Sequence, residues 1–140
     1  MKRDCRDDKF SHLIRLAANW TCQRCGKYYP EGSARRGLHC SHFYSRIKPI
    51  TRWHPWNAAS HCGGCHIYLG DNPIIFDRWI FDYLGKEKYD RLKLLSNKTT
   101  NWRNYEKDLI NKHLAKELKL MLERRKDGDQ SFYFFQPFEI

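Results

Sequence analysis

Two matched cysteine pairs, Cys22-Gln-Arg-Cys25 and Cys62-Gly-Gly-Cys65, and the chain between them decide the fold. A spacing of two residues lets one tight turn present both sulfur atoms to one ion, and two such turns complete a tetrahedral site of four thiolates. Glycines directly after the first pair and inside the second suit turns of this kind. The sequence therefore predicts that these four cysteines hold one structural zinc ion.

Three other interpretations of the cysteines are a disulfide set, four buried thiols and a redox-active C-x-x-C motif. The disulfide set is disfavoured because the start of the chain does not have the pattern of a secretory leader, and thiols stay reduced in the cytosol. A closed site of four thiolates leaves no open position, so the zinc is expected to hold the fold and to do no chemistry. Cys5 and Cys40 stand outside the pairs and are expected to be ordinary small apolar residues.

The charge balance points to an anionic partner. The chain has 140 residues, 26 Lys and Arg against 16 Asp and Glu, and a formal net charge of +10. This length predicts a single domain over residues 1–140. Nucleic acid is the first candidate partner because basic surface releases counterions from phosphates, whereas solubility alone is the alternative. The short apolar runs exclude a membrane span, and the aromatic content, 15%, excludes a disordered chain. A cytoplasmic location is expected.

Apolar spacing predicts an α+β fold. Residues at helical spacing predict helices over 4–20, 73–84, 86–95 and 102–126, and short strands are expected over 38–43 and 57–61. Asn72 as N-cap, Pro73 at the first helical position and Gly85 after the last predict the limits of the second helix.

Three polar residues, His42, Asn57 and His66, fall between or directly after the cysteine pairs. His42 lies on the first predicted strand, Asn57 precedes the second pair, and His66 directly follows it. If both pairs hold one ion, the three side chains converge on one unit made of a strand, a long loop, a second strand and a helix. The long loop between the two strands is called the excursion below. Such a set suits phosphodiester hydrolysis, which needs a base for water and a cation for the developing negative charge.

These residues resemble a known family. The motifs CSHFYSR (Cys40–Arg46), Asn57-Ala58, Cys62-x-x-Cys65-His66 and Gly70-x-Asn72 are similar to those of zinc-bearing HNH (ββα-metal, His-Me finger) endonucleases, and more narrowly to the NinG/Rap recombination nucleases of phages. The resemblance covers about residues 20–85. It implies a small ββα-metal unit stapled by the four-cysteine zinc site, with an N-terminal helix and a helical C-terminal half over 86–140.

The resemblance also implies an activity and a setting. The activity is that of a metal-dependent DNA endonuclease encoded by a phage or prophage, which would act in the host cytoplasm on branched or recombination DNA. A non-catalytic zinc module that binds nucleic acid and recruits a partner is the alternative from another class. An assembly protein that acts through its aromatic C-terminal tail is a third interpretation.

The resemblance assigns a role to each site residue. His42 is the general base, Asn57 holds the strands or the His42 ring, and His66 ligates a catalytic Mg²⁺ or Mn²⁺. Arg46 is expected to contact a phosphate oxygen. Many HNH nucleases carry Asp or His directly before the base, but this chain has a serine there, which is a poor ligand. The other ligands therefore stay open among His39, Ser41, Asp71, Asn72 and water.

A basic and aromatic segment surrounds the predicted hairpin. The residues expected to bind nucleic acid are Arg35, Arg36, Arg46, Lys48 and Arg52. Interleaved aromatic residues suit unstacked bases of a distorted or single-stranded DNA. At least one of Trp53 and Trp56 is nevertheless expected in the core.

The C-terminal part adds two apolar surfaces. The long helix, residues 102–126, carries an apolar stripe that predicts core or a dimer seam, and its Lys and Arg face is either a DNA-tracking or a solvated face. The tail SFYFFQPFEI, residues 131–140, is expected to form an edge strand or to dock onto a partner. A homo-oligomer or a protein partner would use these two surfaces.

Overall fold

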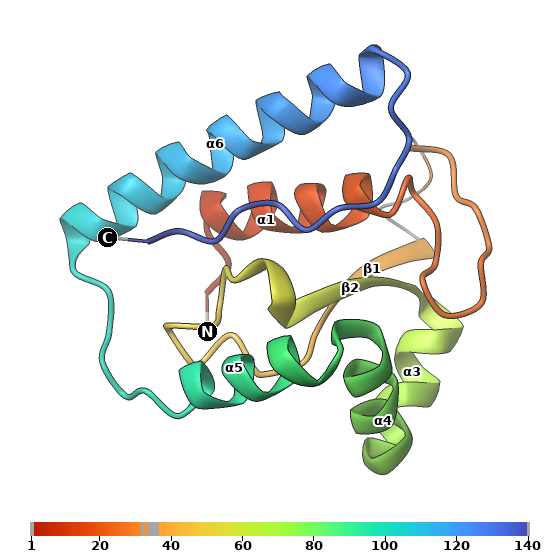
Figure 1. Ribbon diagram of the computed structural model, residues 1–140, viewed down its shortest axis with the longest axis horizontal. Coiled ribbons are helices and arrows are strands. Elements are labelled where there is room, and N and C mark those ends of the chain that lie inside the picture. Colours follow the sequence, from red (N-terminus) through yellow and green to blue (C-terminus); the bar gives the residue numbers. More distant parts are fainter. Residues whose placement is uncertain (1, 32, 34–36, 140) are drawn as a thin grey trace.

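The computed structural model describes residues 2–31, 33 and 37–139. Within these ranges the fold is α+β, with five α-helices and one two-stranded antiparallel sheet (Figure 1). The elements in chain order are α1 (Cys5–Ala17), β1 (Leu38–His42), the 3-10 helix η1 (Pro55–Asn57), β2 (Ala58–Cys62), α3 (Gly63–Asp71), α4 (Pro73–Leu84), α5 (Lys86–Ser96) and α6 (Asn104–Lys126). No helix in this part of the chain is long and apolar enough to cross a membrane.

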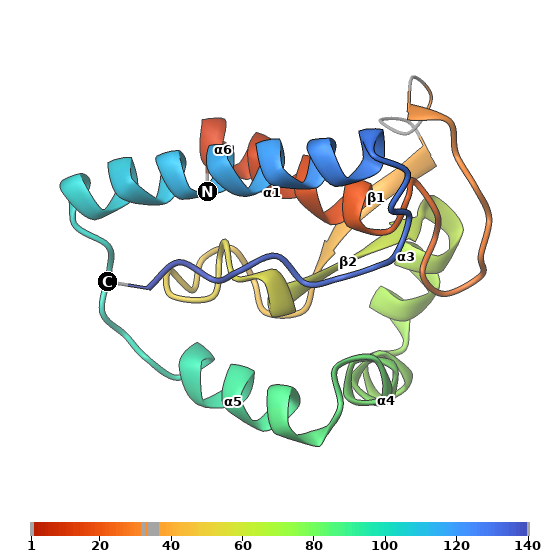
Figure 2. The same cartoon turned by 45° about the horizontal axis from the view of Figure 1, so that its top comes forward.

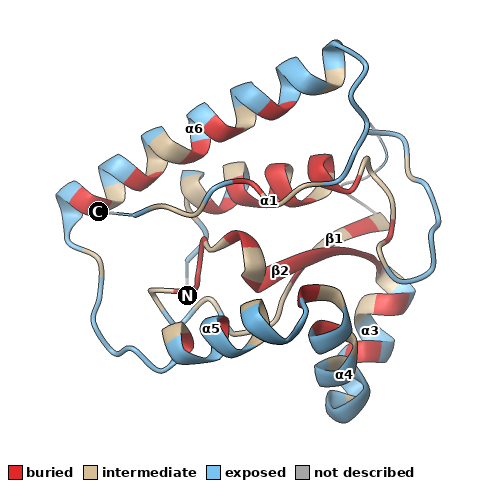
Figure 3. Cartoon of the chain, viewed as in Figure 1, coloured by how far each residue is buried: buried red, intermediate tan, exposed pale blue. Residues whose placement is uncertain are grey.

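Helix α1 forms the centre of the core. Asp4 caps its first turn in a capping box with Asp7, which satisfies amide groups that otherwise have no partner. Phe10 and Leu13 are fully buried. Helix α6 packs along α1 through a buried stripe of Ile110, Leu114 and Met121 (Figure 3), so the apolar stripe predicted for the long helix is core. Burial of these side chains supplies about 1.5–3 kcal/mol each.

The two strands form a hairpin whose faces meet different helices. Leu38 pairs with Cys62 and His42 with Ala58, so the side chains of β1 alternate between the two faces. The His42 ring lies 5.5 Å from the Phe10 ring of α1, whereas the His39 ring lies 5.0 Å from the His66 ring of α3. Strand β2 is buried along its whole length (Figure 3).

The C-terminal tail packs on its own chain. Figure 2 shows α1 and α6 on one side of the hairpin, α4 and α5 on the other, and the tail running between them. Phe135 is 2% exposed and its ring lies 6.0 Å from that of Phe10, while the Phe134 ring lies 5.6 Å from that of Tyr83. Residues 131–139 form no strand, so the expected edge strand is wrong. The tail therefore buries Phe135 in the core of its own chain, whereas Phe132 stays exposed.

Apart from the tail, the predicted helices and strands are confirmed, with a local correction at Asn72. Helix α4 starts at Pro73 and ends before Gly85, whose φ of 80° is a conformation that glycine adopts without strain. The Asn72 side chain does not cap this helix; its Nδ2 donates to the carbonyl of Tyr68 at 2.8 Å. Trp53 is 6% exposed, which confirms that one tryptophan of the basic segment belongs to the core.

Candidate active site and metal centre

The four paired cysteines form one cluster. Their Sγ atoms all lie within 4.8 Å of one another, close enough to hold a structural metal ion such as zinc. Cys22 and Cys25 lie in the turn after α1, Cys62 ends β2, and Cys65 lies in the first turn of α3. A metal at this point would tie the N-terminal helix to the hairpin and to α3.

The surroundings of the cluster act on its thiols in opposite directions: the pKa of Cys22 is lowered, whereas burial raises the pKa of Cys65 to about 12. The backbone N–H of Cys65 donates to the Cys62 sulfur at 3.4 Å, and Arg24 Nη1 donates to the Cys65 sulfur at 3.4 Å. Burial raises the pKa of the Cys22 thiol, but hydrogen bonds from the backbone of Cys25 and of neighbouring residues outweigh it and lower the pKa to about 7. The fit to zinc therefore rests on the four-sulfur donor set and its spacing, and binding of the ion would release the thiol protons.

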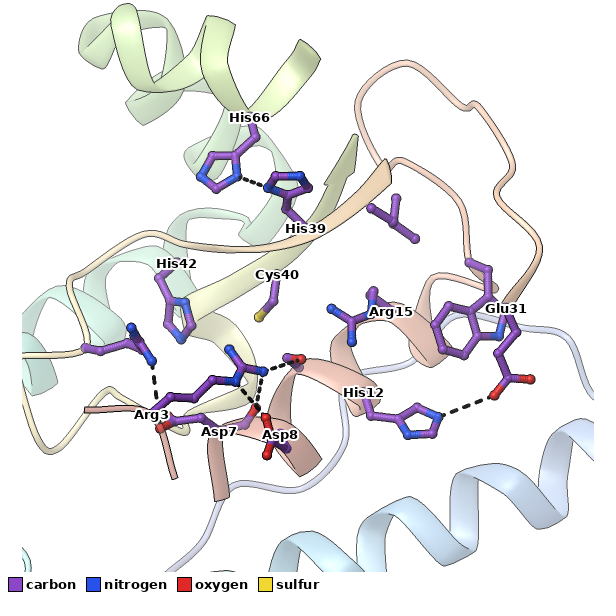
Figure 4. Close-up of a pocket in the computed structure, with 14 residues that line it drawn as sticks. Arg3, Asp7, Asp8, His12, Arg15, Glu31, His39, Cys40, His42 and His66 are labelled. Carbon is purple, nitrogen blue, oxygen red and sulfur yellow. Dashed lines mark hydrogen bonds and ion pairs between the residues drawn. The ribbon is translucent and has the colours of Figure 1, made fainter. Parts of the chain in front are cut away.

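A cleft of about 740 Å³ lies between α1, β1 and the start of α3. Figure 4 shows its side chains, with His39 and His66 together at one end and His42 pointing toward α1. His42, His66 and Arg46, three of the four residues predicted to be catalytic, line this cleft.

His42 ends β1 with its ring held against the core. Its Nε2 atom is buried and has no hydrogen-bond partner among residues 2–31, 33 and 37–139. Burial, and then the positive charge of Arg46, lower the pKa of His42 to about 4, while the backbone of Arg52 and the carboxylate of Asp7 act in the opposite direction. The imidazole is therefore neutral at pH 7, and it is a weaker base than a free histidine.

His66 meets a second histidine. Its Nδ1 atom lies 3.1 Å from Nδ1 of His39. Two ring nitrogens at this separation can bind the same ion, since metal–nitrogen bonds are about 2.0–2.1 Å long for zinc. Among the other candidate ligands, Asp71 is exposed, Asn72 donates to a backbone carbonyl, and the Ser41 side chain is fully buried.

Asn57 holds the excursion between the strands. Its side chain is fully buried; Oδ1 accepts from the Tyr44 N–H at 2.8 Å, and Nδ2 donates to the carbonyls of Tyr44 at 3.0 Å and Thr51 at 2.9 Å. These three bonds replace the backbone ladder where the strands part. Asn57 thus acts on the backbone beside His42 and is not among the residues that line the cleft.

Arg46 and Arg52, two of the residues predicted to contact phosphate, interact with Asp7 in different ways. Arg46 lines the cleft and its Nη1 lies 3.8 Å from the Asp7 carboxylate, without a hydrogen bond to any described residue. Arg52 is 8% exposed and donates through Nε at 3.0 Å and Nη2 at 2.5 Å to the same carboxylate. The prediction that Arg52 binds nucleic acid is therefore wrong, because its guanidinium is an interior counter-ion.

The remaining predicted phosphate contacts lie apart from the cleft or cannot be placed. Lys48 is exposed and its Nζ donates to the carbonyl of Ser96 at 3.1 Å, next to the end of α5. Arg35 and Arg36 lie outside the described residues.

Helix α1 and the residues just before it supply cleft residues that the sequence did not indicate. Arg3 lines the cleft, where its Nη2 donates to the hydroxyl of Ser11 at 3.1 Å and its Nε to Asp8 at 2.6 Å. Asp7 accepts from Trp53 Nε1 at 3.0 Å in addition to its arginine partners. In the sequence, the only feature that marks Asp7 is its place at the third position of the helix, and a capping box alone accounts for an acidic residue there.

The comparisons with known proteins add no relative. Neither the family models, nor the curated proteins, nor the solved structures gave a match to this chain. The likeness to HNH nucleases therefore rests on the motif residues.

Proposed function

We propose that this protein is a metal-dependent DNA endonuclease of the HNH type. The observation that carries the proposal is one cleft lined both by His42, with an unpartnered buried nitrogen, and by the His39–His66 pair. The hairpin and helix that bear them are the ones that the cysteine cluster joins.

His42 is the proposed general base. A neutral imidazole takes a proton from water when its nitrogen lies within hydrogen-bond reach of it. The lowered pKa of His42, about 4, keeps the ring neutral at the pH of a cell. Asn57 acts as a positioning residue, because its three bonds to backbone groups fix the excursion next to the base.

His66 and His39 are the proposed ligands of the catalytic cation. A cation held there would stabilise the negative charge that develops on the phosphate and on the leaving oxygen. Two imidazoles favour a transition metal such as Mn²⁺, Ni²⁺ or Zn²⁺ over Mg²⁺, which prefers oxygen ligands. Two protein ligands leave positions for water and for a phosphate oxygen of the substrate.

Arg46 and Arg3 are the proposed phosphate contacts in the cleft. Arg46 Nη1 makes no hydrogen bond to a described residue, and the Asp7 carboxylate at 3.8 Å compensates its charge only in part. A guanidinium in this state gains charge-assisted hydrogen bonds when a phosphate enters. DNA is the proposed substrate, with branched forms included, and a bacterial cytoplasm that carries a phage or prophage is the proposed setting.

The test is nicking of supercoiled plasmid, and of a branched duplex, by protein that contains one zinc. Parallel reactions contain either no added cation or one of Mg²⁺, Mn²⁺ and Ni²⁺. The zinc content of the protein is measured before and after each reaction. We expect cutting that requires an added cation, with Mn²⁺ or Ni²⁺ more effective than Mg²⁺. Binding of both DNAs without cutting in any cation would instead identify a non-catalytic zinc module.

A further inference from the structure

A second cleft lies between residues 50–56 and the C-terminal part of the chain, apart from the motif residues that resemble those of HNH nucleases. It has a volume of about 830 Å³ and shares no lining residue with the cleft of His42. Its walls come from η1 and the segment before it, from α5, from the loop between α5 and α6, from the start of α6, and from the end of the tail. Figures 1 and 2 both place the C-terminal end of the chain beside this loop.

Rigid aromatic rings line this cleft. Trp102 Nε1 donates to the carbonyl of Pro49 at 2.9 Å, and its ring meets that of Phe138 edge to face at 5.7 Å. The Trp56 ring lies 4.7 Å from the ring of His54. Trp56, Trp102 and Phe138 are only half-buried, so part of each ring faces the cleft. Flat rings fixed in this way can stack with bases at little further entropic cost.

Cations without acidic partners surround the rings. Arg91, Lys98 and Arg103 line the cleft, and none of them forms an ion pair with a carboxylate of the described chain. The guanidinium of Arg91 lies 5.3 Å from the centre of the Trp56 ring. Of the two acids in the lining, Glu106 already accepts from the Arg103 N–H at 2.9 Å.

We infer that this cleft binds a short stretch of single-stranded nucleic acid. Bases stack on Trp102 and Trp56, and the phosphates between them meet Lys98, Arg103 and Arg91. A proline-rich peptide also fits a groove lined by aromatic rings, but it gives the three cations no anionic partner. The cleft is a binding site separate from the proposed nuclease centre, so its occupancy does not depend on cutting.

The experiment measures binding of a fluorescein-labelled oligo(dT) of about 12 nucleotides by anisotropy at several salt concentrations. No divalent cation is added to the zinc-loaded protein, so cutting plays no part in the signal. We expect Trp102→Ala to weaken binding at least about fivefold and Trp102→Phe to weaken it less, because phenylalanine keeps a stacking face.

Lys98→Ala tests the phosphate contacts without altering the core. We expect it to lower the slope of log Kd against log salt by about 0.7, the value for one phosphate contact of a single strand. The matched control is Lys116→Ala, an exposed lysine on α6 that does not line the cleft, and it should keep the wild-type slope.

The inference is overturned if the Trp102 and Lys98 variants bind oligo(dT) with the wild-type Kd and slope. It is also overturned if a proline-rich peptide binds the cleft and oligo(dT) does not compete with it. Thermal unfolding of every variant identifies any loss of binding that comes from a loss of folding. Trp102→Phe and Lys98→Ala keep the test open if Trp102→Ala fails to fold.

Discussion

Asp7 of α1 and Arg52 of the excursion between the strands form a bidentate ion pair in the interior, with donor–acceptor distances of 3.0 and 2.5 Å. Their side chains are 2% and 9% exposed. The pair joins the N-terminal helix to the backbone that follows β1, and Arg46 lies beside it at the edge of the cleft. The ion pair thus connects the proposed catalytic hairpin to a helix outside the HNH motif.

A double-mutant cycle measures the coupling across this pair. We expect Asp7→Asn and Arg52→Met each to lower the free energy of unfolding by about 3 kcal/mol, because each leaves a buried charge without its partner. The double variant should lose clearly less than the sum of the two. Urea unfolding at neutral pH gives the values. Additive losses would show that the two side chains do not interact in solution.

Removal of one clustered cysteine tests the metal centre. We expect Cys62→Ser to lose the bound zinc and most of the cooperative thermal transition, since the site joins three separate segments of the chain. Cys5→Ser is the matched control, because Cys5 is exposed and lies outside the cluster. Elemental analysis should find one zinc in wild type and in the control. Full zinc in Cys62→Ser would contradict the four-cysteine site.

Asn57→Ala tests the link between the excursion and the base. The variant leaves the backbone groups of Tyr44 and Thr51 without partners in a buried site, each at a cost of about 1–3 kcal/mol. We expect a loss of at least about 3 kcal/mol in unfolding free energy, and a larger relative loss of cutting than of DNA binding. Asn97→Ala, an exposed residue at the end of α5, is the control and should change neither.

The pH profile of cutting tests the state of His42. A base must be unprotonated, and burial together with Arg46 lowers the pKa of His42 to about 4. Asp7 opposes this shift and Arg3 adds to it. We expect kcat/KM to stay level from pH 7.5 down to about pH 6, where a free histidine of pKa about 6.5 would already have lost activity. A fall centred near pH 6.5 at a cation concentration that saturates the His39–His66 pair would show that the His42 ring is solvated and the assignment wrong.

The sequence predicted the helices and strands better than it predicted the role of each charged side chain. Local signals such as the C-x-x-C spacing, Pro73 and Gly85 depend on neighbouring residues, and the structure places all three as expected. Arg52 and Arg46 look alike in the sequence, yet one is buried against Asp7 and the other lines the cleft. That difference depends on a helix far away in the chain. The packing of the C-terminal tail against the core of the same chain also depends on contacts between residues far apart in the sequence.

The most direct test of the proposed function is the cutting rate of His42→Ala compared with wild type under single-turnover conditions. His12→Ala is the control, because His12 lines the same cleft from α1 and has no assigned role in the chemistry. With equal zinc in all three proteins, we expect His42→Ala to cut at least about 100-fold more slowly and His12→Ala to stay within a few-fold of wild type. Equal rates for His42→Ala and wild type would contradict the central claim.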